Sequence, residues 1–108
     1  MVENLDPVEV ARRLKERPGA TVLLDVREPY EREAAVIEPS LHIPMNEVPA
    51  RLPEIPKDRE VIVYCHTGAR SMMVAGYLSA HGHRAVANLA GGIDAWSVMV
   101  DPRVPRYG

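Results

Sequence analysis

The chain contains 108 residues, 46% of them hydrophobic, which is enough for one domain with a packed core and disfavours an intrinsically disordered chain. Its 13 basic and 15 acidic side chains give a formal net charge of −2, which disfavours a nucleic-acid partner. No apolar run approaches the roughly 20 residues of a membrane span, and the first residues lack the basic and apolar regions of a secretion signal. We therefore expect a cytoplasmic protein that binds neither nucleic acid nor membrane.

The first part of the chain predicts a helix followed by a buried strand. Asp6 and Pro7 are typical of a helix start, and Pro18 with Gly19 predicts its end. The apolar run over residues 21–26 predicts a strand that is buried on both faces. The other elements expected in this part are a helical turn or two over 29–35, a brief extended piece over 41–44, and a short helix over 47–52 capped by Asn46.

The second part of the chain predicts two strands, each followed by a helix. Residues 60–65 show the clearest strand pattern, and the next helix runs to about His81. Residues 84–89 predict the other strand and 93–99 the last helix, before a proline-rich tail, 100–108, that is expected to be irregular. Strands that alternate with helices predict a parallel sheet covered on both faces, with ligands at the carboxyl ends of the strands.

Cys65 is the only cysteine, which excludes an intrachain disulfide and a multi-cysteine metal site. It ends a predicted strand and faces the start of the next helix, whose unpaired N–H groups and dipole favour an anion. Gly68 lets the loop curl around such an anion, and Arg70 adds a positive charge. The pattern therefore favours a nucleophilic thiolate at Cys65 over a buried, inert thiol.

The length of the cysteine loop separates two kinds of chemistry. Four residues lie between Cys65 and Arg70, whereas cysteine phosphatases have one residue more in a ring that encloses phosphate. A smaller ring favours a smaller guest, such as the outer sulfur of a persulfide on Cys65. An arsenate reductase, a cysteine phosphatase-like enzyme and a non-catalytic binding module remain alternative functions.

Three motifs in this order make the sequence resemble the rhodanese domains, sulfurtransferases that carry sulfur as a cysteine persulfide. The motifs are LDVREPYE at 24–31, YCHTGARS at 64–71 and LAGGIDAW at 89–96, so the resemblance covers nearly the whole chain. It implies a three-layer α/β domain over residues 1–108, with a central, mostly parallel five-stranded sheet and helices on both faces. One departure lies at residues 35–41, which replace the Gly-His-Ile and Pro-Gly-Ala common in the family.

The resemblance implies an enzyme of the thiosulfate sulfurtransferase type with Cys65 as its catalytic residue. Sulfane sulfur would pass from thiosulfate or a protein persulfide to Cys65, and then to a thiol, cyanide or a sulfur-carrier protein. The loop residues expected to cradle the outer sulfur with their backbone N–H groups are His66, Thr67, Gly68, Ala69, Arg70 and Ser71. No metal and no organic cofactor is expected.

Residues outside this loop are expected to support it or to lie on the surface. Asp25 and Arg27 are expected either to form a structural salt bridge or a cap for the following turn, or to hold the loop from beneath, with Asp25 against Arg70. The acidic residues Glu28, Glu31 and Glu33 predict a solvated face. The tail is similar to the end of rhodanese modules fused to adenylating enzymes, so the partners expected besides the sulfur donor are a sulfur-carrier protein, an adenylating enzyme or a cysteine desulfurase.

Overall fold

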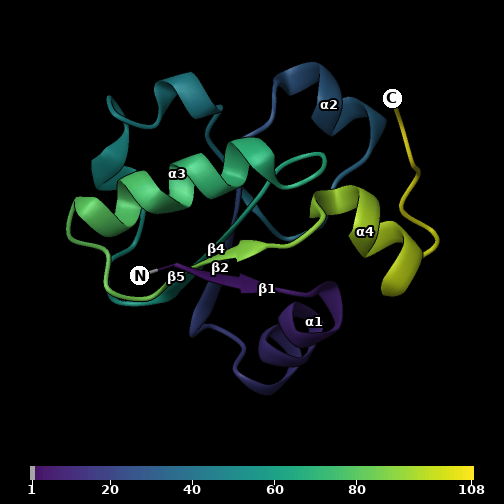
Figure 1. The fold of residues 1–108 in the computed structure, drawn as a ribbon, viewed down its shortest axis with the longest axis horizontal. Helices are drawn as coiled ribbons and strands as arrows, with labels where there is room; N and C mark the ends of the chain where they lie inside the picture. The colour runs from purple at the N-terminus through teal and green to yellow at the C-terminus, as the bar shows by residue number, and fades with distance from the viewer. Residues whose placement is uncertain (1) are drawn as a thin grey trace.

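A five-stranded parallel sheet organises residues 2–108, the part of the chain that the computed structural model describes (Figure 1). Its strands are β1 (Glu3–Leu5), β2 (Thr21–Asp25), β3 (Leu41–His42), β4 (Glu60–Tyr64) and β5 (Val86–Leu89). Their order is β1-β5-β4-β2-β3, and each neighbouring pair is parallel. The carboxyl ends of all these strands therefore meet at one edge of the sheet.

Four α-helices of the described residues surround the sheet, which confirms the expected α/β class. They are α1 (Pro7–Glu16), α2 (Pro29–Ala34), α3 (Ala69–Ala80) and α4 (Gly92–Met99). Figure 1 shows α3 and α1 on opposite sides of the strands, and the buried residues of α4 share a core with those of α1. Asp6 caps α1 as expected, because its Oδ1 accepts a hydrogen bond of 2.9 Å from the Glu9 N–H. Among residues 2–108, none of the helices has the length and apolarity needed to cross a bilayer.

Alternating side chains of the central strand β4 build two separate hydrophobic cores. Val61 and Val63 pack into the core beneath α3, whereas Ile62 and Tyr64 pack into the core beneath α1 and α4. All four side chains are fully buried, and Trp96 of α4 joins the second core. A strand buried on both faces reads as a continuous apolar run, which is why the sequence indicated this strand so clearly.

Two elements differ from those that the sequence predicted. The edge strand β1 was not expected, because only one of its three residues, Leu5, is buried and no alternation marks it. The expected helix over 47–52 is replaced by two 3₁₀ turns, Met45–Glu47 and Leu52–Glu54. Pro53 has no N–H to donate to the carbonyl of Pro49 and disfavours the α conformation at Leu52, so an α-helix begun at 47 is not continued through this segment.

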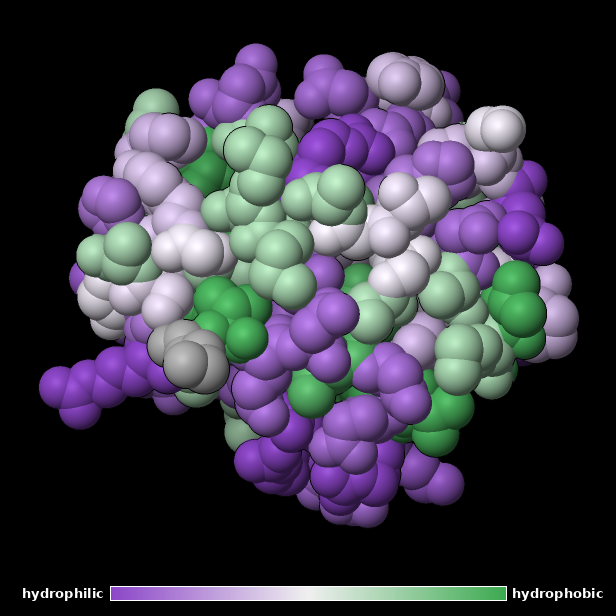
Figure 2. Space-filling model, in the orientation of Figure 1, coloured by the Kyte–Doolittle hydropathy of each residue, from purple (hydrophilic) through white to green (hydrophobic). Residues whose placement is uncertain are grey.

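The surface of the molecule divides by polarity. Figure 2 shows hydrophobic side chains over α3 and α4, and a hydrophilic region over α1. Met73 of α3 and Val98 of α4 are among the exposed apolar residues, at 68% and 62%. The polar face of α1 carries ion pairs such as Arg12 with Glu9 and with Glu16.

The turn between β5 and α4 depends on Gly92, and a pair of glycine variants tests this. Gly92 has a φ of +63°, and a Cβ there would lie 2.5 Å from the Cys65 carbonyl oxygen. We expect Gly92→Ala to lower the free energy of unfolding by about 2 kcal/mol or more. Gly76 lies in the middle of α3, and a Cβ there would meet nothing within 4 Å, so Gly76→Ala should gain about 0.5–1 kcal/mol.

Urea unfolding followed by the fluorescence of the single tryptophan, Trp96, measures both changes. Equal stability of the two alanine variants would contradict the close approach that we describe at Gly92.

Candidate active site

Cys65 lies at the carboxyl end of the sheet, directly after β4 and before the loop that leads into α3 (Figure 1). Its side chain is buried, with 1% of the residue exposed. Gly68 precedes α3 with a φ of +107°, a conformation that favours glycine and that bends the loop back over the cysteine. The structure thus has the strand, loop and helix in the order that the sequence predicted.

The Cys65 sulfur is surrounded by hydrogen-bond donors. The backbone N–H groups of Gly68 and Ser71 point to Sγ at 3.1 and 3.4 Å, and the Ser71 hydroxyl lies 3.3 Å from it. Within residues 2–108, the backbone N–H groups of Thr67, Ala69 and Arg70 have no protein acceptor. Donors without an acceptor at the start of a helix form a site for an anion, so the loop can hold a negatively charged sulfur.

Carbonyl groups of the same loop are engaged by α4. The Cys65 and His66 carbonyl oxygens accept hydrogen bonds from the N–H groups of Ile93 at 2.9 Å and Asp94 at 3.1 Å. Gly92 permits this approach, because any larger residue would collide with the Cys65 carbonyl. Residues of the third sequence motif (89–96) therefore bind the carbonyl oxygens of the second motif (64–71).

Asn88 on β5 fixes the Gly68 end of the loop. Its Nδ2 group donates to the Gly68 carbonyl at 3.3 Å and to Oδ1 of Asn4 at 3.0 Å. Asn88 is only 2% exposed, and its Oδ1 atom has no partner among the described residues. Sequence reasoning did not single out Asn88, although a polar residue in an otherwise apolar strand was a usable signal.

Arg70 is paired with Glu31, which corrects the expectation that Glu31 lies on a solvated face. Its Nη1 and Nη2 groups donate to Oε1 and Oε2 of Glu31 at 2.7 and 2.9 Å. Asp25 does not hold Arg70, and Glu31 does not lie on a solvated face, since it is only 3% exposed. Glu31 also accepts the Glu28 N–H at the start of α2, so capping this helix turns its carboxylate toward the loop.

Asp25 and Arg27 form a buried salt bridge, which is one of the arrangements expected for them. The guanidinium binds both carboxylate oxygens at 2.9 Å, and neither side chain is exposed to solvent. Arg32 at 3.0 Å and the Tyr64 hydroxyl at 3.1 Å add donors to Asp25. Burial raises the pKa of Asp25, but these hydrogen bonds, chiefly from Arg27, outweigh burial and hold that pKa below its usual range.

A residue of the C-terminal tail, Tyr107, lies against the active loop. Its ring stacks on the His66 ring with centroids 4.1 Å apart, and its hydroxyl donates to Oε2 of Glu31 at 2.7 Å. Arg27 donates to the same hydroxyl at 3.0 Å. The tail is irregular as expected, but no pattern in the sequence indicated that a residue 76 positions from Glu31 would reach it.

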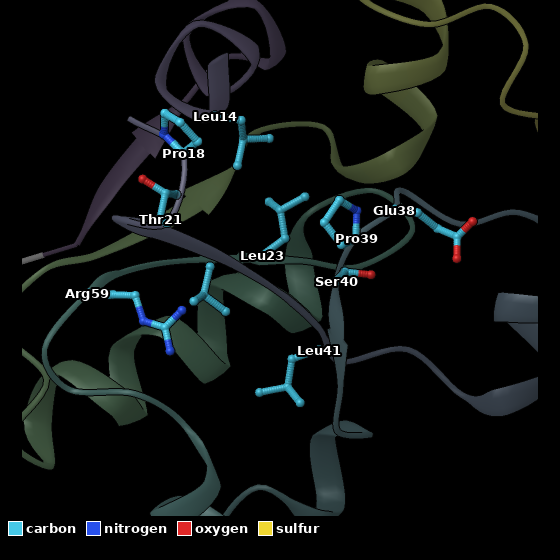
Figure 3. Close-up of a pocket in the computed structure, with 11 residues that line it drawn as sticks. Leu14, Pro18, Thr21, Leu23, Glu38, Pro39, Ser40, Leu41 and Arg59 are labelled. Atoms are coloured by element: carbon cyan, nitrogen blue, oxygen red, sulfur yellow. The ribbon is translucent and has the colours of Figure 1, made fainter. Parts of the chain in front are cut away.

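A metal-binding cluster or a cavity away from the cysteine loop would be a second candidate site. In the described part of the chain, no three side chains among histidine, cysteine, aspartate and glutamate are grouped so that they could hold a metal ion. An apolar hollow of about 560 Å³ lies between the end of α1 and the β2–β3 edge, where Leu14, Leu23 and Leu41 line it (Figure 3). No residue of the loop 65–71 lines this hollow, so it is separate from Cys65.

Comparison with known proteins agrees with this geometry. The family model described as "Rhodanese-like domain" matches residues 6–99 of the chain. The crystal structure of a rhodanese-related protein from Thermoplasma volcanium matches with a TM-score of 0.84 at 28% sequence identity, covering 97% of this chain and 99% of that one. The fold class expected from the sequence is confirmed.

The sequence is also similar to proteins named for sulfur transfer. A "Sulfurtransferase" from Allochromatium vinosum is 41% identical over 90% of this chain and 90% of that protein. A "Thiosulfate sulfurtransferase GlpE" from Tolumonas auensis is 30% identical over 82% of this chain and 83% of that protein. The "Probable adenylyltransferase/sulfurtransferase MoeZ" from Mycobacterium tuberculosis is 32% identical over 79% of this chain, which spans only 22% of that longer protein.

The ion pair of Glu31 predicts a pH dependence of stability. Hydrogen bonds from Arg70, above all, lower the pKa of Glu31 from 4.5 to about 2. Its ionised form therefore stabilises the fold above about pH 4.5, and this contribution of about 3 kcal/mol is lost as the pH falls toward 2. Below about pH 5, the free energy of unfolding should fall more steeply for the wild type than for Glu31→Gln.

Urea unfolding at several pH values measures the two slopes. Glu33→Gln, on the exposed face of the same helix, is the matched control and should keep the wild-type slope. Identical slopes for the wild type and Glu31→Gln would contradict the assignment.

Proposed function

This chain belongs to the rhodanese-like domain family and is a sulfurtransferase of that type, and from this premise we propose that Cys65 carries sulfane sulfur as a persulfide. The observation that supports the proposal best is the set of donors around Cys65 Sγ, from the Gly68 N–H, the Ser71 N–H and the Ser71 hydroxyl. These donors point at the sulfur atom that would carry the negative charge of a thiolate, and the thiolate is the nucleophilic form of cysteine. We take residues 1–108 to form one such catalytic domain.

In the first step, the Cys65 thiolate attacks the outer sulfur of a donor such as thiosulfate. The new bond joins Sγ to that sulfur, and the sulfur–sulfur bond of thiosulfate breaks. Its electron pair leaves with sulfite, so the enzyme retains a persulfide with one negative charge. The N–H groups of Thr67, Ala69 and Arg70, which have no other acceptor in residues 2–108, are available to stabilise the charge on the outer sulfur.

In the second step, a nucleophilic acceptor attacks the outer sulfur. The bond between Sγ and that sulfur breaks, and its electron pair returns to Cys65 as the thiolate. With cyanide as the acceptor, the product is thiocyanate. Both steps leave the same negative charge within the same loop, so donors fixed by the fold can stabilise both transition states without rearrangement.

The acceptor in the cell is proposed to be a sulfur-carrier protein. The relative MoeZ combines adenylyltransferase and sulfurtransferase in its name, and 22% of its length matches this chain. We propose that the chain supplies sulfur to a carrier that an adenylating enzyme activates, with thiosulfate or a cysteine desulfurase as the sulfur source. A small acceptor such as cyanide then serves as a convenient probe of the second step.

A thiosulfate-to-cyanide transfer assay tests the proposed function. Wild-type protein should produce thiocyanate, and Cys65→Ser should produce none. Ser71→Ala removes one donor, the hydroxyl 3.3 Å from Sγ, so we expect its kcat to fall by roughly threefold to tenfold. Ser79→Ala, later in α3 and without a hydrogen bond to the loop, is the matched control and should keep wild-type activity.

Two results would contradict the proposal. Thiocyanate formation by Cys65→Ser would show that the cysteine carries no sulfur. Turnover of an aryl phosphate ester by the wild type, without any thiocyanate, would favour the cysteine-phosphatase alternative.

A further inference from the structure

Tyr107 contacts residues that control both ends of the active loop. At the beginning of the loop, its ring stacks on His66, the residue that follows Cys65, with an angle of 17° between the rings. At the end of the loop, its hydroxyl donates to the Glu31 carboxylate that holds Arg70. One side chain from the tail therefore connects the two ends of the active loop around Cys65.

The hydroxyl of Tyr107 also joins two ion pairs into one network. It accepts a hydrogen bond from Arg27 of the buried Asp25–Arg27 pair and donates one to Glu31 of the Glu31–Arg70 pair. Burial raises the pKa of Tyr107 to about 12, so the hydroxyl keeps its proton and remains a donor at neutral pH. Both hydrogen-bonding roles of this oxygen are used.

Separate contacts fix the tail that carries Tyr107. Arg106 forms a bidentate pair with the Asp94 carboxylate at 2.9 and 3.0 Å, and the Ser97 hydroxyl donates to the Val104 carbonyl at 2.6 Å. Asp94 also donates its backbone N–H to the His66 carbonyl. Asp94 of α4 thus binds both the tail and the active loop. Tyr107 adds a direct contact between the tail and the loop.

We propose that Tyr107 is a positioning residue for sulfur transfer, which keeps His66 and the Glu31–Arg70 pair in place and so holds the loop around Cys65. This inference rests on the proposed function, since the loop is the proposed persulfide cradle. Donors that stabilise a developing charge must be held within a fraction of an ångström to act fully. Loss of the Tyr107 hydroxyl should therefore slow the chemical steps more than it weakens donor binding.

Steady-state kinetics with thiosulfate and cyanide tests the proposal. Tyr107→Phe keeps the stacked ring and loses the hydroxyl, so its kcat should fall by roughly threefold to tenfold, while its KM for thiosulfate changes by less than about twofold. Tyr107→Ala also loses the stacking and should be slower still. Tyr30→Phe, on a tyrosine of α2 that is 70% exposed, is the matched control and should match the wild type.

A double-mutant cycle shows whether Tyr107 acts through Glu31. In a Glu31→Gln background, the further effect of Tyr107→Phe on kcat should be much smaller than in the wild type. Unfolding midpoints measured for every variant exclude simple loss of folded protein as the cause. Additive losses, or a wild-type kcat for Tyr107→Phe, would overturn the proposal, as would a Tyr107→Ala variant that is faster than the wild type, which would indicate a lid.

A second measurement does not depend on turnover. The Tyr107 hydrogen bond helps to lower the pKa of Glu31, so carboxyl NMR should show a higher Glu31 pKa in Tyr107→Phe than in the wild type. An unchanged Glu31 pKa would refute the link between tail and loop. If the wild type makes no thiocyanate, the proposed function fails, while this measurement still decides whether Tyr107 positions the Glu31–Arg70 pair.

Discussion

The active loop can present its N–H groups to Cys65 because its carbonyl oxygens are bound elsewhere. α4 donates two backbone hydrogen bonds to the carbonyls of Cys65 and His66, and the Gly68 carbonyl accepts from Asn88 and Met72. The C=O and N–H of a trans peptide point in opposite directions, so these bonds direct the N–H groups of the same peptide units, those of His66, Thr67 and Ala69, to the other side. The orientation of these three N–H groups is thus a consequence of how the loop packs on β5 and α4, and these contacts need no charged residue.

Charged residues form a second layer around this backbone scaffold. The Asp25–Arg27 pair is fully buried and therefore carries a large desolvation cost, whereas in the Glu31–Arg70 pair only the carboxylate is buried. A fully buried pair such as Asp25–Arg27 fixes geometry, because removing one partner leaves an uncompensated charge. The place of the two ion pairs beside the loop, with Tyr107 between them, therefore fits a role in holding the loop, whereas the hydrophobic cores on the two faces of the sheet hold the fold.

The sequence predicted the elements that bury apolar side chains and missed contacts between polar residues far apart in the chain. Strand β4 was predictable because its residues 61–64 form an unbroken hydrophobic run, whereas β1 has a single buried residue. The cysteine loop was predictable because its residues are contiguous. Glu31 was misplaced on a solvated face, since local sequence cannot show that a carboxylate is buried against an arginine 39 residues away. Tyr107 lies further still, in a tail with no regular structure.

Intact-protein mass spectrometry tests most directly whether Cys65 is a carrier of sulfur. Purified protein would be measured before and after incubation with thiosulfate, beside a Cys65→Ser variant. We predict that the wild type gains the mass of one sulfur atom, that a reducing thiol removes it, and that the variant gains nothing. No gain by the wild type, from thiosulfate or from a cysteine desulfurase supplied with its substrate, would contradict sulfur transfer through Cys65.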